Sequence, residues 1–94
     1  MNDEFSVQVQ EVLGRRMRRR RRALDMSQEV FAERAGIHRT QTTLYERGRR
    51  MPYASTLIKL AAALEMSVDQ LLVGIEWRVE GPPAGDRTED DPNG

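Results

Sequence analysis

The apolar residues of this chain recur at intervals of three and four along most of its length, which is the spacing of one face of an α-helix. Val9, Leu13 and Met17 illustrate this spacing near the start of the chain. No segment alternates apolar and polar residues as a half-buried strand does. Because helical faces of this kind leave water by packing on one another, the fold is predicted to be all-α.

Capping residues and helix breakers divide this pattern into five helices. Ser27 can accept a hydrogen bond from a free amide at the start of a helix, and Gly36 can end that helix in a left-handed conformation. Pro52 disfavours helix at the residue before it. The predicted helices are 9–24, a helix between Ser27 and Gly36, 39–47, a helix marked by Leu57 to Leu64, and a short helix opened by Ser67.

The chain of 94 residues is long enough for one small domain with a modest core. We predict an N-terminal extension over residues 1–8 and a compact five-helix domain over residues 9–77. Residues 78–94 are rich in glycine, proline and acidic residues and have almost nothing to bury. They are therefore predicted to form a disordered acidic tail.

The residue types that most enzyme and metal sites need are scarce. The chain has no cysteine and one histidine, which argues against disulfides, zinc–thiolate sites and poly-histidine metal sites. No nucleophile–base pair, carboxylate pair or phosphate-binding glycine loop can be assembled, so we expect no enzyme activity, cofactor or small-molecule ligand. No apolar run approaches the roughly 18 residues that span a bilayer, and the acidic N-terminus is unlike a signal peptide. We therefore expect no membrane partner and a cytoplasmic location.

The formal net charge is zero, but the charges are unevenly distributed. Residues 15–50 contain 12 arginines and four acidic residues, whereas residues 51–94 contain three basic and eight acidic residues. A local concentration of positive charge attracts polyanions whatever the total charge is. The arginine-rich segment therefore favours a nucleic-acid partner.

The arginines between positions 15 and 22 divide by their angle around the first predicted helix. Arg15, Arg18, Arg19 and Arg22 lie opposite the apolar stripe, where a solvated face, with a secondary phosphate contact behind it, is the expected role. Arg20 falls within the stripe, and it can avoid burial of its charge by extending its stem along the core.

Several motifs, in order and without gaps, resemble those of one family of DNA-binding proteins. The Cro and lambdoid-repressor (Xre) family has SQExxA…AGI, ERGxxxP and TLxKLAxAL motifs, which are similar to residues 27–37 (SQEVFAERAGI), 46–52 (ERGRRMP) and 56–64 (TLIKLAAAL). The cap and leucine pair of residues 67–72 resembles the last helix of that family. The resemblance covers about residues 13–75 and implies a repressor-like fold that contains a helix-turn-helix.

The resemblance implies that residues 39–47 form a recognition helix in the major groove of double-stranded DNA. Its polar side chains suit base edges, because arginine can bond guanine through two hydrogen bonds, glutamine can bond adenine and threonine can contact the thymine methyl. The residues expected to contact bases are Arg39, Thr40, Gln41, Thr43 and Leu44.

Other residues are expected to contact the DNA backbone. Gln28 lies at a helix start, where an amide side chain and free backbone amides can both hold a phosphate. His38 is expected either to cap the recognition helix or to contact a phosphate. Arg47, Arg49 and Arg50 leave that helix into a loop and would contact phosphates, which positions a protein without specifying sequence.

The resemblance also implies a structural ion pair between Arg21 and the glutamate that ends the recognition helix, Glu46. A half-buried charge without a partner would be costly, which supports the same expectation. Thr42 stands where the family has an aliphatic residue, so it should weaken the core or bond back to a carbonyl one turn earlier. Glu65 replaces the usual glycine after the fourth helix, which is therefore expected to close differently.

Together these expectations favour a sequence-specific, double-stranded DNA-binding transcriptional regulator. One recognition helix reads few base pairs, so a homodimer on a palindromic site is expected, associated with the nucleoid. The expected dimer surface is the region of the fourth and fifth helices, with Met66, Val68, Leu72, Ile75 and Trp77. The alternative is a protein-interaction module or antitoxin-like adaptor with the same fold.

Overall fold

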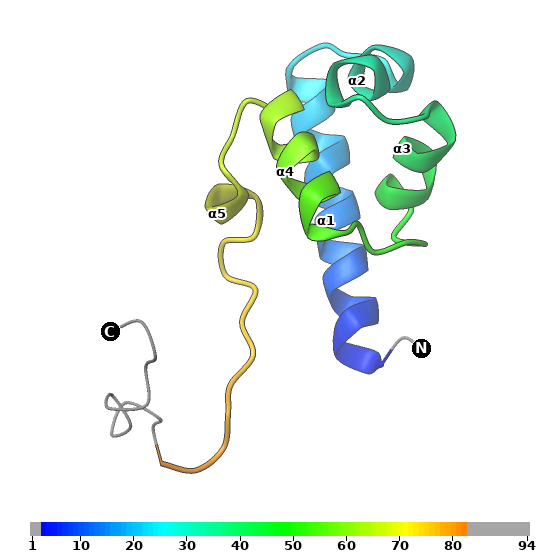
Figure 1. Cartoon of the computed structure of the whole chain (residues 1–94). Helices are drawn as coiled ribbons and strands as arrows, with labels where there is room; N and C mark the ends of the chain where they lie inside the picture. Colours follow the sequence, from blue (N-terminus) through cyan, green and yellow to red (C-terminus); the bar gives the residue numbers. More distant parts are fainter. Residues whose placement is uncertain (1–2, 83–94) are drawn as a thin grey trace.

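The computed structural model describes residues 3–82 and contains five α-helices and no strand in that range (Figure 1). The helices are α1 (Glu4–Ala23), α2 (Gln28–Ala35), α3 (Arg39–Glu46), α4 (Ala54–Ala63) and α5 (Val68–Leu71). The predicted all-α, five-helix fold is confirmed. Residues 78–82 have neither helix nor strand, and the rest of the predicted acidic tail lies outside the described residues.

α1 begins five residues earlier than the apolar spacing predicts. The carboxylate of Asp3 accepts a hydrogen bond of 2.7 Å from the backbone amide of Ser6, which caps the helix. The rings of Phe5 and Trp77 then meet edge to face, with centroids 5.0 Å apart. Residues 4–8, predicted to belong to an N-terminal extension, are therefore part of α1.

Four of the five helices are followed by a residue with a left-handed backbone conformation: Asp25, Gly36, Gly48 and Glu65, with φ between 57° and 69°. After α4, the amide of Met66 donates to the carbonyl of Ala61 at 3.0 Å, as in a Schellman cap. The prediction that α4 would close differently because of Glu65 is therefore wrong. Arg20 contributes to this closure, because its guanidinium donates to the carbonyls of Leu64 and Glu65 at 2.9 and 3.4 Å.

The core lies where α1 is packed against α3 and α5, and α2 against α3 and α4. Its fully buried side chains are Phe31, Met17, Leu60, Leu64, Leu71 and Thr42. Val30 of α2 lies outside this core and is 47% exposed. The hydroxyl of Thr42 is buried without a hydrogen-bond partner among the described residues, so the expected bond to a carbonyl is absent.

Gly14 marks the closest approach of α1 and α3. A Cβ atom added there would lie 2.5 Å from the carbonyl oxygen of Tyr45 and 2.7 Å from that of Glu46. Both oxygens belong to backbone, which cannot move aside as the end of a side chain can. Gly14 therefore sets the distance between α1 and the end of α3.

We expect Gly14→Ala to lower the free energy of unfolding by about 1–3 kcal/mol, the range for overpacked sites. Helix propensity alone predicts the opposite sign, because alanine favours a helix interior by roughly 1 kcal/mol over glycine. Urea denaturation followed by circular dichroism measures the change. A more stable variant would show that the two helices can separate without cost.

Candidate nucleic-acid interface

The two helices α2 and α3 pack on each other and are joined by residues 36–38. Gly36 adopts φ of +69°, and the amide of Ile37 donates to the carbonyl of Ala32 at 3.0 Å, which turns the chain directly after α2. Ile37 is half-buried against the core. These contacts fix the angle at which α3 leaves α2.

The start of α3 is closed by a capping box. The Nδ1 atom of His38 accepts a hydrogen bond from the amide of Thr40 at 3.1 Å. The Oε1 atom of Gln41 in turn accepts from the amide of His38 at 3.2 Å. The cap that was one of the two roles expected of His38 is therefore present, and the side chain of Gln41, expected on a base, is engaged in the same helix start in this structure.

The first turn of α3 faces solvent. Arg39 and Thr40 are exposed, whereas Thr43 and Leu44 are half-buried. Arg39 lies 3.4 Å from the carboxylate of Glu29, in a pair whose side chains are 62% and 73% exposed. An exposed pair of this kind contributes at most about 1 kcal/mol, so Arg39 can exchange it for another partner.

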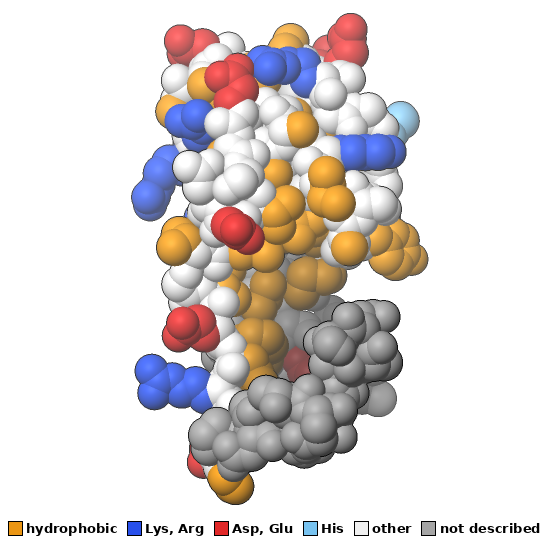
Figure 2. Space-filling view, turned by 60° about the vertical axis from the view of Figure 1, so that its left-hand side comes forward, with side chains coloured by type: hydrophobic (Ala, Val, Ile, Leu, Met, Phe, Trp, Pro, Cys, Tyr) orange, Lys and Arg blue, Asp and Glu red, His pale blue; other side chains and the backbone are white. Residues whose placement is uncertain are grey.

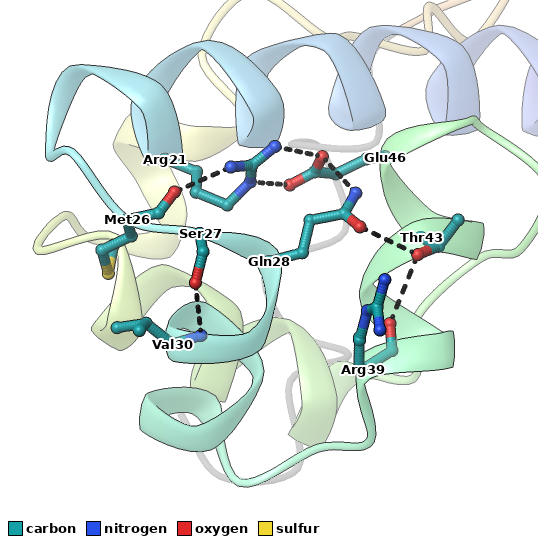
Figure 3. A network of polar contacts seen from close by, with 8 residues as sticks. All are labelled: Arg21, Met26, Ser27, Gln28, Val30, Arg39, Thr43 and Glu46. Carbon is teal, nitrogen blue, oxygen red and sulfur yellow. Dashed lines mark hydrogen bonds and ion pairs between the residues drawn. The ribbon is translucent and has the colours of Figure 1, made fainter.

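The opposite end of α3 is held by a buried network between three helices (Figure 3). Arg21 donates from Nε to Oε2 of Glu46 at 2.5 Å and from a terminal nitrogen to Oε1 at 3.0 Å. These side chains are 10% and 3% exposed. The hydrogen bond to Glu46 raises the pKa of Arg21, which keeps its guanidinium charged.

Gln28 connects this network to Thr43 in α3. Its Nε2 donates to Oε1 of Glu46 at 3.1 Å, and its Oε1 accepts from the hydroxyl of Thr43 at 3.1 Å (Figure 3). The structure thus brings Gln28, Thr43, Glu46 and Arg21 together. Sequence reasoning placed Gln28 and Thr43 on DNA and did not foresee their contact with each other.

The three arginines beyond α3, Arg47, Arg49 and Arg50, are exposed. The loop that carries them is anchored by backbone contacts, because the amide of Arg49 donates to the carbonyl of Leu44 at 2.9 Å. The buried side chain of Gln10 also donates to the carbonyl of Gly48 at 3.1 Å. The loop is therefore fixed to α1, although its guanidinium groups remain in solvent.

Sequence reasoning missed one structural arginine. Arg16 donates to the carbonyl of Leu71 at 2.8 Å, where it satisfies the end of α5. The position of Arg16 around α1, next to the apolar stripe, is the sequence signal that could have predicted its contact with another helix. Among residues 3–82, no group of three or more metal-ligating side chains is placed to bind an ion, and no helix is long and apolar enough to cross a membrane.

This geometry defines a helix-turn-helix protein: a short supporting helix, a sharp turn, and a second helix anchored at its end and exposed at its start. A family model described as helix-turn-helix matches residues 17–71. The chain therefore belongs to the helix-turn-helix family, and its predicted resemblance to Cro-like and lambdoid repressors is confirmed.

Two relatives in sequence are a control protein and a transcriptional regulator. The chain is 42% identical over 66 residues to control protein C.SmaI of Serratia marcescens, covering 70% of this chain and 79% of the relative. It is 41% identical over 64 residues to an uncharacterized transcriptional regulator in the ATPase CF(0) region of Rhodospirillum rubrum. That alignment covers 68% of this chain and 59% of the relative, so this chain spans only part of that protein's length.

Solved structures show the same fold. The restriction-modification controller protein C.AhdI from Aeromonas hydrophila superimposes with a TM-score of 0.64 at 34% identity, over 66% of this chain and 94% of that one. The DNA-binding domain of the P22 c2 repressor superimposes with a TM-score of 0.64 at 29% identity, over 72% of this chain and 90% of that one.

We expect Arg21→Met to lower the free energy of unfolding by about 3–5 kcal/mol, because it leaves the buried carboxylate of Glu46 without its cation. The double variant Arg21→Met with Glu46→Met should cost less than the single variant, since no lone charge remains. Thermal and urea unfolding measure both, with Arg15→Met as a control on the exposed face of α1. If the cost of the double variant equals the sum of the costs of the single variants Arg21→Met and Glu46→Met, the pair does not act as a unit.

Proposed function

We propose that this chain is a sequence-specific, double-stranded DNA-binding transcriptional regulator that places α3 in the major groove and acts by binding rather than by catalysis. The observation that carries the proposal is the contrast between the two ends of α3: Glu46 is held by a buried ion pair, while Arg39 and Thr40 are exposed. A helix anchored in this way can present side chains to base edges in a fixed register. Binding to chromosomal DNA would place the protein at the nucleoid.

The family supports DNA rather than protein as the partner. The relatives include a transcriptional regulator, a control protein and a transcriptional repressor. The exposed arginines after α3 add a sequence-independent attraction to phosphates. The alternative of a protein-interaction module is therefore not favoured.

The binding site itself can be found by selecting bound fragments from a pool of random duplexes. The proposed function predicts an enriched sequence of defined length. Enrichment without a shared sequence would leave a non-specific DNA-binding protein, and no enrichment at moderate salt would contradict the proposal.

Two substitutions separate base contacts from backbone contacts. We expect Arg39→Ala to weaken binding to the selected duplex by about 1–3 kcal/mol and to relax specificity at one position. Arg49→Ala should weaken binding to all duplexes about equally. It should also reduce the salt slope, which is the slope of the logarithm of the binding constant against the logarithm of the salt concentration, by about 1. Fluorescence anisotropy with the selected and a scrambled duplex, at several salt concentrations, measures both. Unchanged affinity in both variants would contradict the assignment of α3 as the recognition helix.

We propose further that the protein binds a palindromic site as a homodimer. The support is an apolar surface on the side of α4 and α5, visible as a band of hydrophobic side chains in Figure 2. Trp77, one of the residues expected in this surface, is 69% exposed, and Val73 and Val79 are 65% and 81% exposed. The other residues expected there, Met66, Val68, Leu72 and Ile75, are half-buried, and the first three of them pack against the core. An exposed apolar band of this kind is typical of interfaces.

Light scattering tests this proposal, and we expect the mass of two chains at micromolar concentration. Val73→Glu should shift the protein to the mass of one chain, because a second copy would bury the charge. Its helix content should not change, since Val73 is outside the core. A wild-type protein that remains monomeric with and without the selected duplex would contradict the dimer.

A further inference from the structure

The arginines of α1 fall into two groups. Seven occur between positions 15 and 22, and three of them have partners inside the protein: Arg16 and Arg20 at carbonyls that end α5 and α4, and Arg21 at Glu46. The other four are exposed and form no ion pair with any of residues 3–82. We call these four the outer arginine face: Arg15, Arg18, Arg19 and Arg22.

The outer arginine face is unfavourable for the isolated protein. Arg15 with Arg19, and Arg18 with Arg22, stand four residues apart on one helix, where like charges repel. The acidic residues within one helical turn of this face are Glu11 and Asp25, and neither is within ion-pair distance of an arginine of the face. A bound polyanion would remove this repulsion.

Two adjoining surface hollows connect this face to the candidate interface. The first, of about 420 Å³, is lined by the four arginines themselves. The second, of about 350 Å³, is lined by Arg18 and Arg22 together with Gln28 and Arg47 and with the ion pair of Arg21 and Glu46. Arg18 and Arg22 line both hollows, whereas Arg15 and Arg19 line only the first.

The second hollow has the charge that an anion needs. Four guanidinium groups line it against one carboxylate. That carboxylate, on Glu46, is already bound by Arg21 and Gln28, so it does not face the hollow as a free charge. A phosphate held there would contact Arg18, Arg22 and Arg47, and it would lie beside Gln28 at the start of α2.

We propose that Arg18 and Arg22, together with Arg47, hold backbone phosphates of the DNA that flanks the segment read by α3. The proposal rests on the proposed function and widens its footprint onto α1. Duplex DNA fits better than a lipid surface, because the hollow is shared with Gln28 and Arg47. No large hydrophobic side chain among residues 8–29 is exposed for insertion into a bilayer.

The test compares two double variants with the same loss of charge on the same helix, Arg18→Gln with Arg22→Gln, and Arg15→Gln with Arg19→Gln. The probes are the selected duplex and the same duplex extended by about ten base pairs, one helical turn, on each side. Circular dichroism should show unchanged helix content, because all four side chains are exposed.

On the extended duplex we expect the first double variant to reduce the salt slope by about 1.8, which corresponds to two lost phosphate contacts. Between 50 and 200 mM salt, the wild type should therefore lose about tenfold more affinity than this variant does. On the short duplex the first variant should bind like the wild type. The second double variant should change the slope by less than half as much on either duplex.

If the two double variants reduced the salt slope on the extended duplex equally, the proposal would be overturned, because the effect would then reflect net charge alone. If the first double variant reduced the salt slope equally on the short and the extended duplex, the proposal would be overturned as well, since the phosphate contacts would not lie on the flanks. Binding to phosphatidylserine vesicles that this variant abolishes, with duplex affinity unchanged, would assign the face to lipid. A wild-type chain that binds neither duplex would refute the proposed function itself.

Discussion

The buried ion pair between Arg21 and Glu46 is the constraint on which the candidate interface depends. It joins α1 to the last residue of α3, and the same two side chains reach the segment before α2 through Met26 and the start of α2 through Gln28. Because the pair is shielded from water, loss of either partner would leave a buried charge that is far more costly than a surface one. One contact thus fixes three helices relative to each other, and it leaves the start of α3 free to meet a ligand.

The period of the α-helix explains why a run of arginines can serve two purposes. Successive residues advance by about 100°, so neighbours in sequence point to different sides of α1. Arg16, Arg20 and Arg21 point toward the other helices, where the first two donate to part-buried carbonyls and Arg21 binds a buried carboxylate. Arg18 and Arg22 point outward beside them. The arginines that point inward therefore hold α3, α4 and α5 in place. Because they fix α1, they also position Arg18 and Arg22 next to Gln28 and Arg47.

The sequence predicted those parts of the fold that depend on local signals, such as the cap at Ser27 and the turn at Gly36. The predictions were wrong where contacts between residues distant in sequence determine the local structure. Glu65 adopts a left-handed conformation that costs a non-glycine residue roughly 1–2 kcal/mol, and the reach of Arg20 to the adjacent carbonyls, which no local pattern shows, supports that closure. The close contact of Gly14 with the carbonyl oxygen of Tyr45 joins residues 31 positions apart, so no local pattern reveals it.

The candidate base-contacting residues were predicted from residue type, but the structure distinguishes them by the bonds they already make. Gln41 is engaged in the cap of α3, and Thr43 in a hydrogen bond to Gln28. Each would have to exchange a formed bond for one to a base, whereas Thr40 is exposed and Arg39 gives up only a weak surface pair. In the proposed function, direct reading of bases by one α3 would therefore rest on few side chains. Binding through so few base contacts would need additional binding energy, which the proposed second copy and the proposed contacts to flanking phosphates would supply without reading more bases.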